Sequence, residues 1–572
     1  MIQKRWKTDV LVIGGGGAGL RAALAAAEAG SGVVIVNKGP VSRSGITLTA
    51  AGGMQAPFHK DDSIEQYFQD TIRCGYGLGD PQLARILAAG ACEAVLDLER
   101  YGARFVRNED GEFALGQFPG QSRPRNLFVK GGGIGIVSAL AKACKAHESI
   151  RIIDDFFVTG LIKGISAGKS IIAGAMGLDL RSGELTLIRA SSVVLATGGC
   201  QWLWEVNDCP TDATGEGLAY AYRAGANLID MEMVLFYPSV IVWPPSVKGA
   251  FVHYEFLAES ILDGNVYDKN GQPVLPKPLP VRDQAMRMMD KALCEGRGGA
   301  HGGLLWYVGD SPKGSGAVQK KLNIAQYNYL KLHGVDPTTA KIEVAPGAHY
   351  LMGGIHINEE CQTTLEGLFA TPECAGNFDG ANRLAGNGIA ATQVFGARAG
   401  RYAHRWATDN LMVKLDPASV EEEETRVARR LTTHSGAGTD DMSAVVNTLR
   451  DRLRAMVQRY TGVSRNRSGL KLLSQVAHDI RQELAYQQVP DQKVYNQALV
   501  DLLQLESMCD IAMLVAGSAR LRTESRGHHF RSDFPLQDDA NWLQHTCVKQ
   551  VGEKPEFGRE PIGYFDGLSR FN

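Results

Sequence analysis

The chain has 572 residues, and 60 lysines and arginines against 62 aspartates and glutamates give it a formal net charge of −2. This balance removes the electrostatic case for a nucleic-acid partner or an anionic membrane surface. No apolar run reaches the ~18 residues of a membrane span, and the N-terminus carries no signal-peptide pattern. We therefore predict a cytoplasmic protein without a membrane-spanning segment.

The first forty residues read as one βαβ unit. Residues 9–13 are a buried apolar strand, residues 20–30 an alanine-rich helix that ends at a glycine, and residues 33–36 a second strand. Gly14-x-Gly16-x-x-Gly19 lies between strand and helix, where glycines permit a tight turn and close approach of the backbone to a pyrophosphate. This pattern in this place predicts dinucleotide binding.

Two further features bear on that site. The second strand ends in Asn37 and Lys38, not in the acidic residue that usually holds the adenosine ribose, so the site is a modified one. Ala196-Thr-Gly-Gly199 follows another buried strand, and Asp212 stands close behind it. Taken alone, this turn is equally well explained as an ordinary strand end or as a second contact of the chain with the cofactor. The nearby Asp212 favours the cofactor contact.

Ten cysteines are spread along the chain without a C-x-x-C pair, and no histidine spacing matches a metal motif. A disulfide scaffold, an iron–sulfur cluster within the chain and a metal site are therefore not expected. Glycine accounts for 66 of the 572 residues, or about 11.5%, against ~7% in an average protein. This excess indicates tight turns and close approach of the backbone to a ligand.

Residues 150–188 are rich in predicted strands, residues 240–345 carry proline-rich loops around helices, and glycine patterns resume near residue 344. Amphipathic helices are predicted at 441–460, 468–487 and 494–515. We predict an α/β fold with a doubly wound dinucleotide-binding domain, an inserted α+β domain and a C-terminal helical domain. The expected boundaries are 1–237 and 345–405 for the first domain, 238–344 for the second, 406–520 for the third, and 521–572 for a tail.

The chain resembles the flavoprotein subunit family of succinate dehydrogenase and fumarate reductase, which includes L-aspartate oxidase. The matching motifs run in family order from residue 9 to about residue 545, which makes the resemblance specific. They are the Gly14–Gly19 turn, Ser42 to Gly53, Leu195 to Gly199, Asp230 to Glu232, Arg282-Asp283, Glu295 to Gly298, His349 to Gly354, Gly367 to Ala370 with Glu373, Gly380 to Leu384 with Asn387, and Arg522 to Gly527.

The resemblance implies FAD as the cofactor. It makes the doubly wound domain an FAD-binding domain and the inserted α+β domain a capping domain. It places the following residues against FAD: Gly14, Gly16, Gly17, Ala18, Gly19, Asn37, Lys38, Gly39, Ser44, Gly45, Thr47, Gly52, Gly53, Val158, Ala196, Thr197, Gly198, Asp212, Glu373, Arg383, Asn387, Gly388 and Ile389.

The resemblance also implies catalytic residues. Arg282 matches the family's proton-donating arginine, and His349 and Arg383 match its carboxylate-binding pair. The chemistry agrees, because hydride transfer to or from a carbon beside a carboxylate develops negative charge that fixed cations stabilise. Free guanidinium barely ionises, so the proton-donor role of Arg282 rests on the resemblance.

Four departures concern linkage and specificity. The family's flavin-linking histidine is absent from the stretch around Ile46, so we expect non-covalent FAD. The family's Q-F-H-P-T stretch reads Leu235 to Ser239, which puts Leu235 and Tyr237 at substrate-binding positions. A family glutamine becomes Ala51, and our alignment places Phe256 at the capping Thr-Glu pair. Phenol and aliphatic surface weaken an anion site, so we expect an acid other than a standard C4 dicarboxylate.

The sequence therefore predicts an FAD-dependent oxidoreductase of the fumarate reductase type acting on a small carboxylic acid. An L-aspartate oxidase-like amino-acid oxidase is the alternative enzyme, and an electron-transfer flavoprotein subunit without its own substrate is the alternative of another class. A conservative exchange at Tyr237 with no change of substrate is also open. In this family a separate iron–sulfur subunit commonly exchanges electrons with the flavin, and it is the expected partner.

Overall fold

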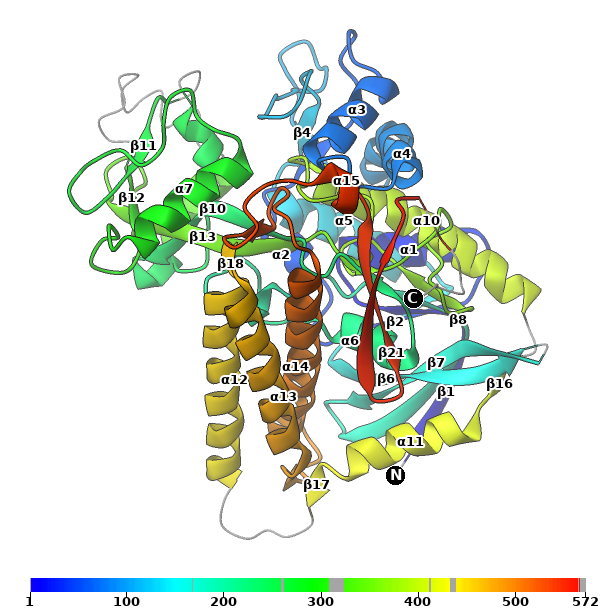
Figure 1. Cartoon of the computed structure of the whole chain (residues 1–572). Helices are drawn as coiled ribbons and strands as arrows, with labels where there is room; N and C mark the ends of the chain where they lie inside the picture. The colour runs from blue at the N-terminus through cyan, green and yellow to red at the C-terminus, as the bar shows by residue number, and fades with distance from the viewer. Residues whose placement is uncertain are drawn as a thin grey trace.

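The computed structural model describes residues 2–166, 168–258, 262–307, 324–410, 413–432, 439–563 and residue 565; residues 564 and 566–572 of the predicted tail lie outside them. A mixed sheet of order β16-β6-β7-β8-β1-β2-β5, with β15 against β8, forms the centre (Figure 1). Its strands are β1 (Ile2–Ile13), β2 (Val33–Val36), β5 (Ile150–Ile153), β6 (Phe156–Ser166), β7 (Lys169–Asp179), β8 (Glu184–Leu195), β15 (Leu368–Ala370) and β16 (Lys414–Leu415).

The predicted βαβ unit is present. β1 pairs in parallel with β2 and with β8, and Val10, Leu11 and Val12 are fully buried at its centre. β1 begins earlier than predicted, because residues 2–7 also pair with β8 while half exposed. Around the sheet lie α1 (Gly17–Glu28), α2 (Ile46–Thr49), α3 (Ile64–Cys74), α4 (Pro81–Arg100), α5 (Gly132–Ala146), α6 (Glu216–Ala224), α10 (Asn387–Asp409) and α11 (Pro417–Ala428), and the ribbon of β3 (Gly53–Gln55) and β4 (Asn126–Phe128).

The described residues of the segment 238–344, called the cap below, project as a separate lobe with an apolar core of its own (Figure 1). Its antiparallel sheet has the order β10-β13-β12-β11. The cap elements are β10 (Val234–Trp243), β11 (Asn265–Tyr267), α7 (Arg282–Cys294), β12 (Leu304–Tyr307), α9 (Ile324–Leu332), β13 (Ile342–Leu351) and the 3-10 turns η2 (Pro245–Val247) and η3 (Tyr254–Leu257). β10 and β13 continue beyond the cap and join it to the rest of the chain.

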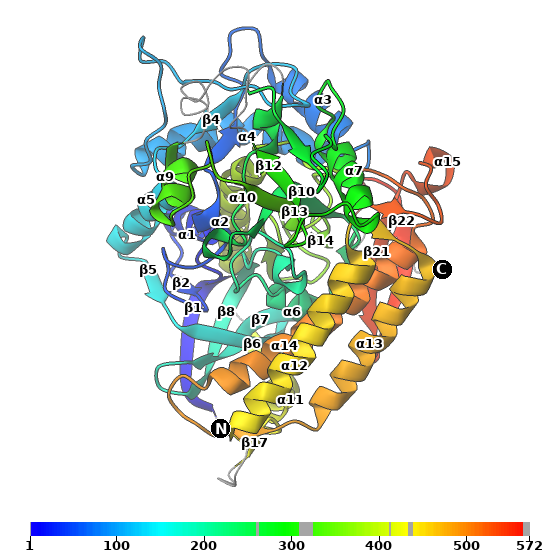
Figure 2. The ribbon, with the colours of Figure 1, turned by 90° about the vertical axis from the view of Figure 1, so that its left-hand side faces the viewer.

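The three predicted C-terminal helices pack side by side as α12 (Thr439–Thr461), α13 (Arg467–Ala485) and α14 (Gln497–Leu521) (Figure 2). The chain then returns to the centre, where β21 (His545–Val551) pairs with β22 (Lys554–Glu560) and β9 (Leu228–Ile229). The remaining short elements are η1 (Gln201–Leu203), β14 (Gly354–Ile355), β17 (Leu431–Thr432), β18 (Ser464–Arg465), β19 (Val489–Pro490), β20 (Phe530–Arg531) and α15 (Asp539–Trp542).

Buried ion pairs fix this return. Arg522, which has no exposed surface, donates to Glu232 at 2.6 Å and to Asp230 at 3.2 Å between the central fold and β21.

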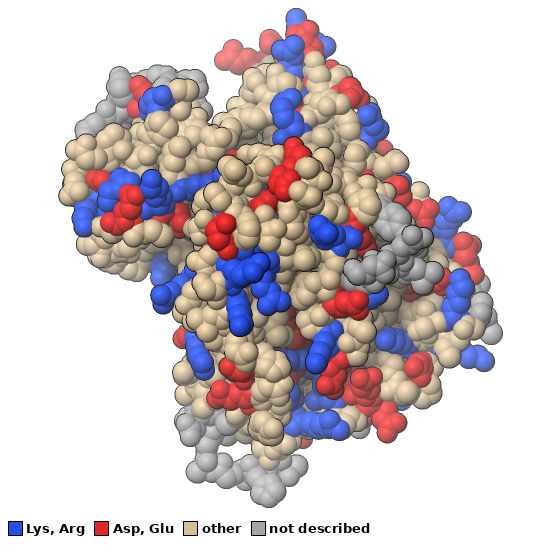
Figure 3. Space-filling model, in the orientation of Figure 1, with Lys and Arg blue, Asp and Glu red and all other residues tan. Residues whose placement is uncertain are grey.

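Acidic and basic side chains are mixed over the face in Figure 3, where an indentation divides the cap from the lobe that carries α3 and α4. Among the described residues, none of the helices combines the length and apolar character needed to span a bilayer.

Candidate functional site

Two adjoining cavities lie in the central fold, and the second of them extends to the cap. The first, called the glycine cavity, follows the Gly14–Ala18 turn and has about 890 Å³ of empty volume with open solvent included. The second, called the arginine cavity, holds Arg282 and Arg383 and has about 1050 Å³ on the same measure. Both are lined by Ile46, Thr47, Pro372, Glu373 and Thr392, so they form one continuous site.

The glycine cavity collects residues from several segments that are separated along the chain. Of the residues that the sequence places against FAD, it is lined by Gly14, Gly16, Gly17, Ala18, Asn37, Lys38, Gly45, Thr47, Val158, Ala196, Thr197, Gly198, Asp212 and Glu373. Buried Thr197 Oγ1 and Asp212 Oδ1 have no hydrogen-bond partner among the described residues. Such orphaned buried polar atoms indicate a polar ligand, and a dinucleotide supplies hydroxyl and phosphate groups for them.

Glycine is required at the turn itself. Gly14 has a φ of +112°, and a Cβ there would lie 2.2 Å from the carbonyl oxygen of Ala196. Gly19 does not line the cavity, but its Cβ would lie 1.9 Å from the Gly14 carbonyl oxygen. The first glycine therefore lets the two strand ends meet, and the last lets α1 approach the turn. The residues fit a bound dinucleotide.

Asn37 and Lys38 are both engaged within the protein. Asn37 accepts from the Gly15 N–H at 2.8 Å and donates to Gly39 O at 2.6 Å, so it braces the glycine turn. Lys38 Nζ lies 2.7 Å from the Glu216 carboxylate. Burial alone would raise the pKa of Glu216, but the positive charge of Lys38 outweighs it and lowers that pKa. Gly39 and Ser44 lie behind the wall, where Ser44 accepts from Asn37 at 2.9 Å.

The arginine cavity takes the other residues assigned to FAD and the catalytic trio. Gly52, Gly53, Gly388 and Ile389 line it, as do Arg282, His349 and Arg383. Asn387 is fully buried beneath it and accepts from Gln55 and from the hydroxyl of Tyr67. Gly388 leaves room for the arginine, because a Cβ there would lie 2.2 Å from Arg383 Nη1.

Glu373 stands where the two cavities meet. It is buried, and both of its hydrogen bonds, from Gln201 and from the Leu351 N–H, go to Oε1. Burial raises the pKa of this carboxyl to about 7, against the smaller opposing effect of the Gln201 bond. Glu373 therefore changes charge near neutral pH in the ligand-free chain.

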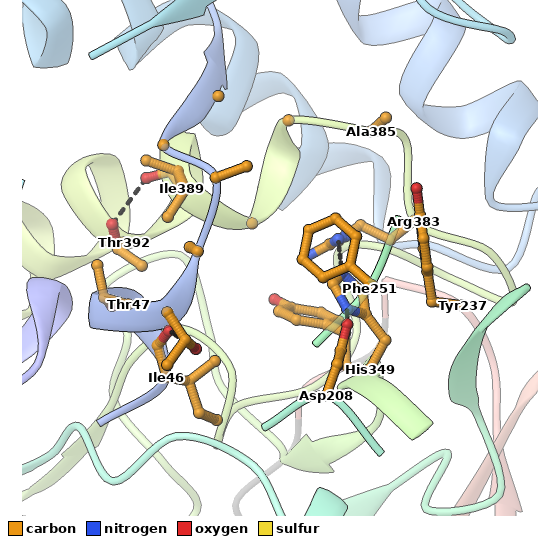
Figure 4. Close-up of a pocket in the computed structure, with 18 of the residues that line it drawn as sticks. Ile46, Thr47, Asp208, Tyr237, Phe251, His349, Arg383, Ala385, Ile389 and Thr392 are labelled. Carbon is orange, nitrogen blue, oxygen red and sulfur yellow. Dashed lines mark hydrogen bonds and ion pairs between the residues drawn. The ribbon is translucent and has the colours of Figure 1, made fainter. Parts of the chain in front are cut away.

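A β-bulge presents His349 to the cavity. Leu235 pairs with Tyr350 and Phe236 with Ala348, so His349 is the extra residue on β13. Bulges commonly re-aim a side chain in this way. Figure 4 shows His349 between Asp208, 2.7 Å from Nδ1, and Arg383, 3.1 Å from Nε2. Because guanidinium can only donate, Nε2 accepts from Arg383, which leaves the hydrogen on Nδ1 to bond Asp208.

Arg282 is the first residue of α7 and reaches the cavity from the cap. Its guanidinium donates to Glu255 at 2.8 Å and lies 5.2 Å from the centre of the Tyr237 ring. Burial opposes its charge, but the Glu255 carboxylate outweighs burial and raises the pKa of Arg282 above its ordinary value. Arg282 therefore remains a cation.

Tyr237 lines the arginine cavity, but its hydroxyl is occupied. It donates to Glu255 at 2.6 Å, and the ring packs against His349 with 5.3 Å between ring centres. Burial alone would raise the pKa of Glu255. Its neighbours His253, Arg282 and Tyr237 outweigh burial and hold that pKa well below its ordinary value. The ionised carboxylate of Glu255 thus accepts hydrogen bonds from both Tyr237 and Arg282.

The other two residues assigned to the substrate lie elsewhere, which corrects those assignments. Leu235 is fully buried in a small core with Met233 and Tyr350, whereas Tyr237 belongs to the core of the cap. Phe256 packs on the cap core and against His253, with 4.7 Å between ring centres, and does not line the cavity.

Sequence reasoning missed the acidic and aromatic wall of the arginine cavity. Glu255, one residue before the misplaced Phe256, Asp208 and Phe251 all line it. So does His253, whose buried Nε2 has no hydrogen-bond partner among the described residues. The family's Thr-Glu pair, at which our alignment placed Phe256, is the signal that points to the neighbouring Glu255, whereas no motif marks Asp208.

The comparisons with known proteins agree with this geometry. A family model described as "FAD binding domain" matches residues 9–389, and one described as "Fumarate reductase flavoprotein C-term" matches residues 450–565. The chain is 34% identical to a subunit of the fumarate reductase (CoM/CoB) of Methanothermobacter marburgensis, over 98% of this chain and 100% of that one.

Two further relatives show the breadth of the family. The L-aspartate oxidase of Caulobacter vibrioides is 30% identical over 95% of this chain and 96% of its own. A solved structure of E. coli quinol fumarate reductase FrdA superposes with a TM-score of 0.87 at 26% identity, covering 98% of each chain. These matches confirm the predicted fold class and FAD as the cofactor.

Proposed function

Because the chain belongs to the flavoprotein family of fumarate reductase and succinate dehydrogenase, we propose that it transfers a hydride between FAD and a small carboxylic acid. It is an FAD-dependent oxidoreductase acting on CH–CH bonds. The observation that carries the substrate proposal is the meeting of Arg282, His349 and Arg383 in one cavity that continues into the glycine cavity. An electron-transfer subunit without a substrate would need no such convergence.

One carboxylate of the substrate binds at Arg383. Its guanidinium lies 4.1 Å from the centre of the Tyr350 ring and contacts His349, so its plane is held from two sides. A planar, fixed guanidinium suits a carboxylate because two N–H groups match two oxygens. Asp208 orients His349, and thereby Arg383, through the Nδ1 bond.

Arg282 is the second cation of the reacting end. Fixed in charge by Glu255, it stabilises the negative charge that develops on the carbon and carboxylate during transfer. The geometry supports this electrostatic role directly. The proton-donor role comes from the resemblance, and the nearby carboxylate makes deprotonation of Arg282 harder.

The far end of the substrate is the point where this chain departs from a dicarboxylate enzyme. Two guanidinium groups, Arg282 and Arg383, share the cavity wall with the carboxylates Glu255 and Asp208. The wall therefore carries little excess positive charge for a dianion. The hydroxyl of Tyr237 is committed to Glu255, and Phe251 adds apolar surface. We infer a substrate with one carboxylate and a distal group that is not a simple carboxylate.

Two properties accompany this proposal. FAD is expected to bind non-covalently, because Ile46 lines both cavities at the linkage segment and offers no nucleophile. The archaeal relative is named as one subunit of a fumarate reductase, which supports a separate electron-transfer partner. An iron–sulfur subunit is the partner that we propose.

A single-turnover experiment tests the activity. Photoreduced protein is mixed without oxygen with fumarate, monomethyl fumarate, acrylate and cinnamate, and reoxidation of the flavin absorbance is followed. Rapid reoxidation by at least one acid is expected. Reoxidation by none would favour the electron-transfer subunit, and reduction of oxidised protein by L-aspartate would favour the amino-acid oxidase.

A further inference from the structure

A strained tyrosine joins the FAD-binding part to the cap. Tyr76 lies between Gly75 and Gly77, in the loop after α3, with a φ of +57°. Bulky residues rarely adopt this left-handed conformation, and they keep it only where surrounding contacts hold them. Arg526 donates to the Tyr76 carbonyl oxygen at 3.0 Å from the C-terminal part of the chain.

The side chain of Tyr76 crosses to the cap. Its hydroxyl donates to Asp283 Oδ2 at 2.6 Å, and Asp283 is the fully buried neighbour of Arg282 in the first turn of α7. Burial and the Asp283 charge hold the pKa of the Tyr76 phenol above its ordinary value, so it remains a donor. The contact therefore acts directly on the turn that carries Arg282.

A second contact closes the same face of α7. Arg287, one turn after Asp283, lies 3.2 Å from its carboxylate and donates to Gly527 O at 2.6 Å. The cap otherwise continues into the central fold through β10 and β13, whose pairing is irregular at Leu235/Phe236 and between Tyr237 and Val240. A bulge disrupts the hydrogen-bond ladder locally, so these strands alone hold the cap less firmly, and contacts on α7 help to set how closely the cap sits over the cavity.

We propose that Tyr76 is a positioning residue that holds the cap closed through Asp283 and thereby fixes Arg282 over the arginine cavity. The proposal rests on the role of Arg282 in the proposed function. Loss of one hydroxyl then loosens the cap and displaces the cation from the reacting carbon without touching the cofactor turn. Displacements of this kind lower rate more than binding.

The test compares Tyr76→Phe with Tyr101→Phe in the FAD-loaded protein. Tyr101 is a matched control, because its half-buried phenol also donates to a carboxylate, Glu28, at 2.8 Å, but far from the cap. Quenching of flavin fluorescence by potassium iodide, against potassium chloride at equal ionic strength, measures access to the site. Turnover with the best acid of the panel gives kcat and KM separately.

Tyr76→Phe is expected to raise the iodide quenching constant about threefold or more and to lower kcat about tenfold, with KM and FAD content little changed. Tyr101→Phe should match the unmodified protein. Tyr76→Gly, which relieves the positive φ, should show the same opening without loss of thermal stability. A purely structural tyrosine would lower stability and leave quenching and the kcat-to-KM split unchanged.

Unchanged quenching in Tyr76→Phe overturns the proposal, as does unchanged kcat. If no acid reoxidises even the unmodified protein, the proposed function has failed. The iodide measurement alone then decides whether Tyr76 holds the cap.

Discussion

The glycine cavity and the arginine cavity are lined by different parts of the chain, the first by backbone and the second by side chains. The first is made mostly of backbone and small residues, where an added Cβ at Gly14 or Gly19 would lie about 2 Å from another chain segment. The second is made of charged and aromatic side chains brought from the central fold and the cap, such as Asp208, Glu255 and Arg282.

The two cavities tolerate substitution to different degrees. A backbone cradle has no substitute for glycine, so it keeps one ligand class. A pocket of side chains can exchange charge and shape at single positions while the fold persists, as Tyr237 bonded to Glu255 illustrates. Cofactor identity and substrate identity are therefore carried by separate regions of one site.

The largest effect is expected in the glycine cavity. Gly14→Ala should yield protein without bound flavin, because the new Cβ meets the Ala196 carbonyl oxygen at a positive φ. Gly30→Ala is the matched control, since Gly30 has nearly the same φ of +111° but its nearest neighbour is 3.9 Å away. The control should keep its flavin and lose only about 1 kcal/mol of stability. Flavin absorbance per purified chain measures both, and a flavin-loaded Gly14→Ala would refute the steric argument.

The next effect concerns charge in the arginine cavity. Arg282→Ala should lower kcat by about 10²–10⁴ while FAD stays bound, because one fixed cation is lost and Glu255 is left unpaired. Arg297→Ala removes another cap arginine, paired with Asp268 and Glu295 outside the cavity, and should change kcat little. Steady-state rates with the best acid of the panel compare the two, and equal rates would remove Arg282 from the reaction.

A smaller effect follows from orientation. Asp208→Ala leaves His349 Nδ1 without its acceptor, so Arg383 loses its fixed partner and kcat/KM should fall about 10- to 100-fold. Glu205→Ala, three residues earlier and exposed, is the control. If both variants have the same kcat/KM, Asp208 does not orient the carboxylate clamp.

The smallest effect is a pH dependence of stability in the apoprotein. Burial raises the pKa of Glu373 from 4.5 to about 7, so the folded chain binds more protons than the unfolded chain between those values. Stability from this group is therefore full below pH 4.5 and falls as pH rises towards 7, by about 2–3 kcal/mol. Glu373→Gln should flatten that part of the denaturation profile, and parallel profiles for both proteins would contradict the shift.

The glycine cavity could be predicted from the sequence more fully than the arginine cavity. The order strand, Gly14–Gly19, helix is local, so backbone geometry follows from adjacent residues. The placing of Leu235 failed because it was carried over from a motif position, and a motif does not record which core a side chain enters once the strand is packed. Asp208 and Tyr76 act on residues far away in the chain, and only the folded arrangement reveals their contacts.

The most direct measurement compares fumarate with monomethyl fumarate as oxidants of the reduced protein. The two acids share the reacting carbons and one carboxylate, and differ mainly in the charge at the far end. Because Glu255 and Asp208 offset Arg282 and Arg383, we expect a higher kcat/KM for the monoester. A tenfold or greater preference for fumarate would contradict it and make Tyr237 a conservative exchange.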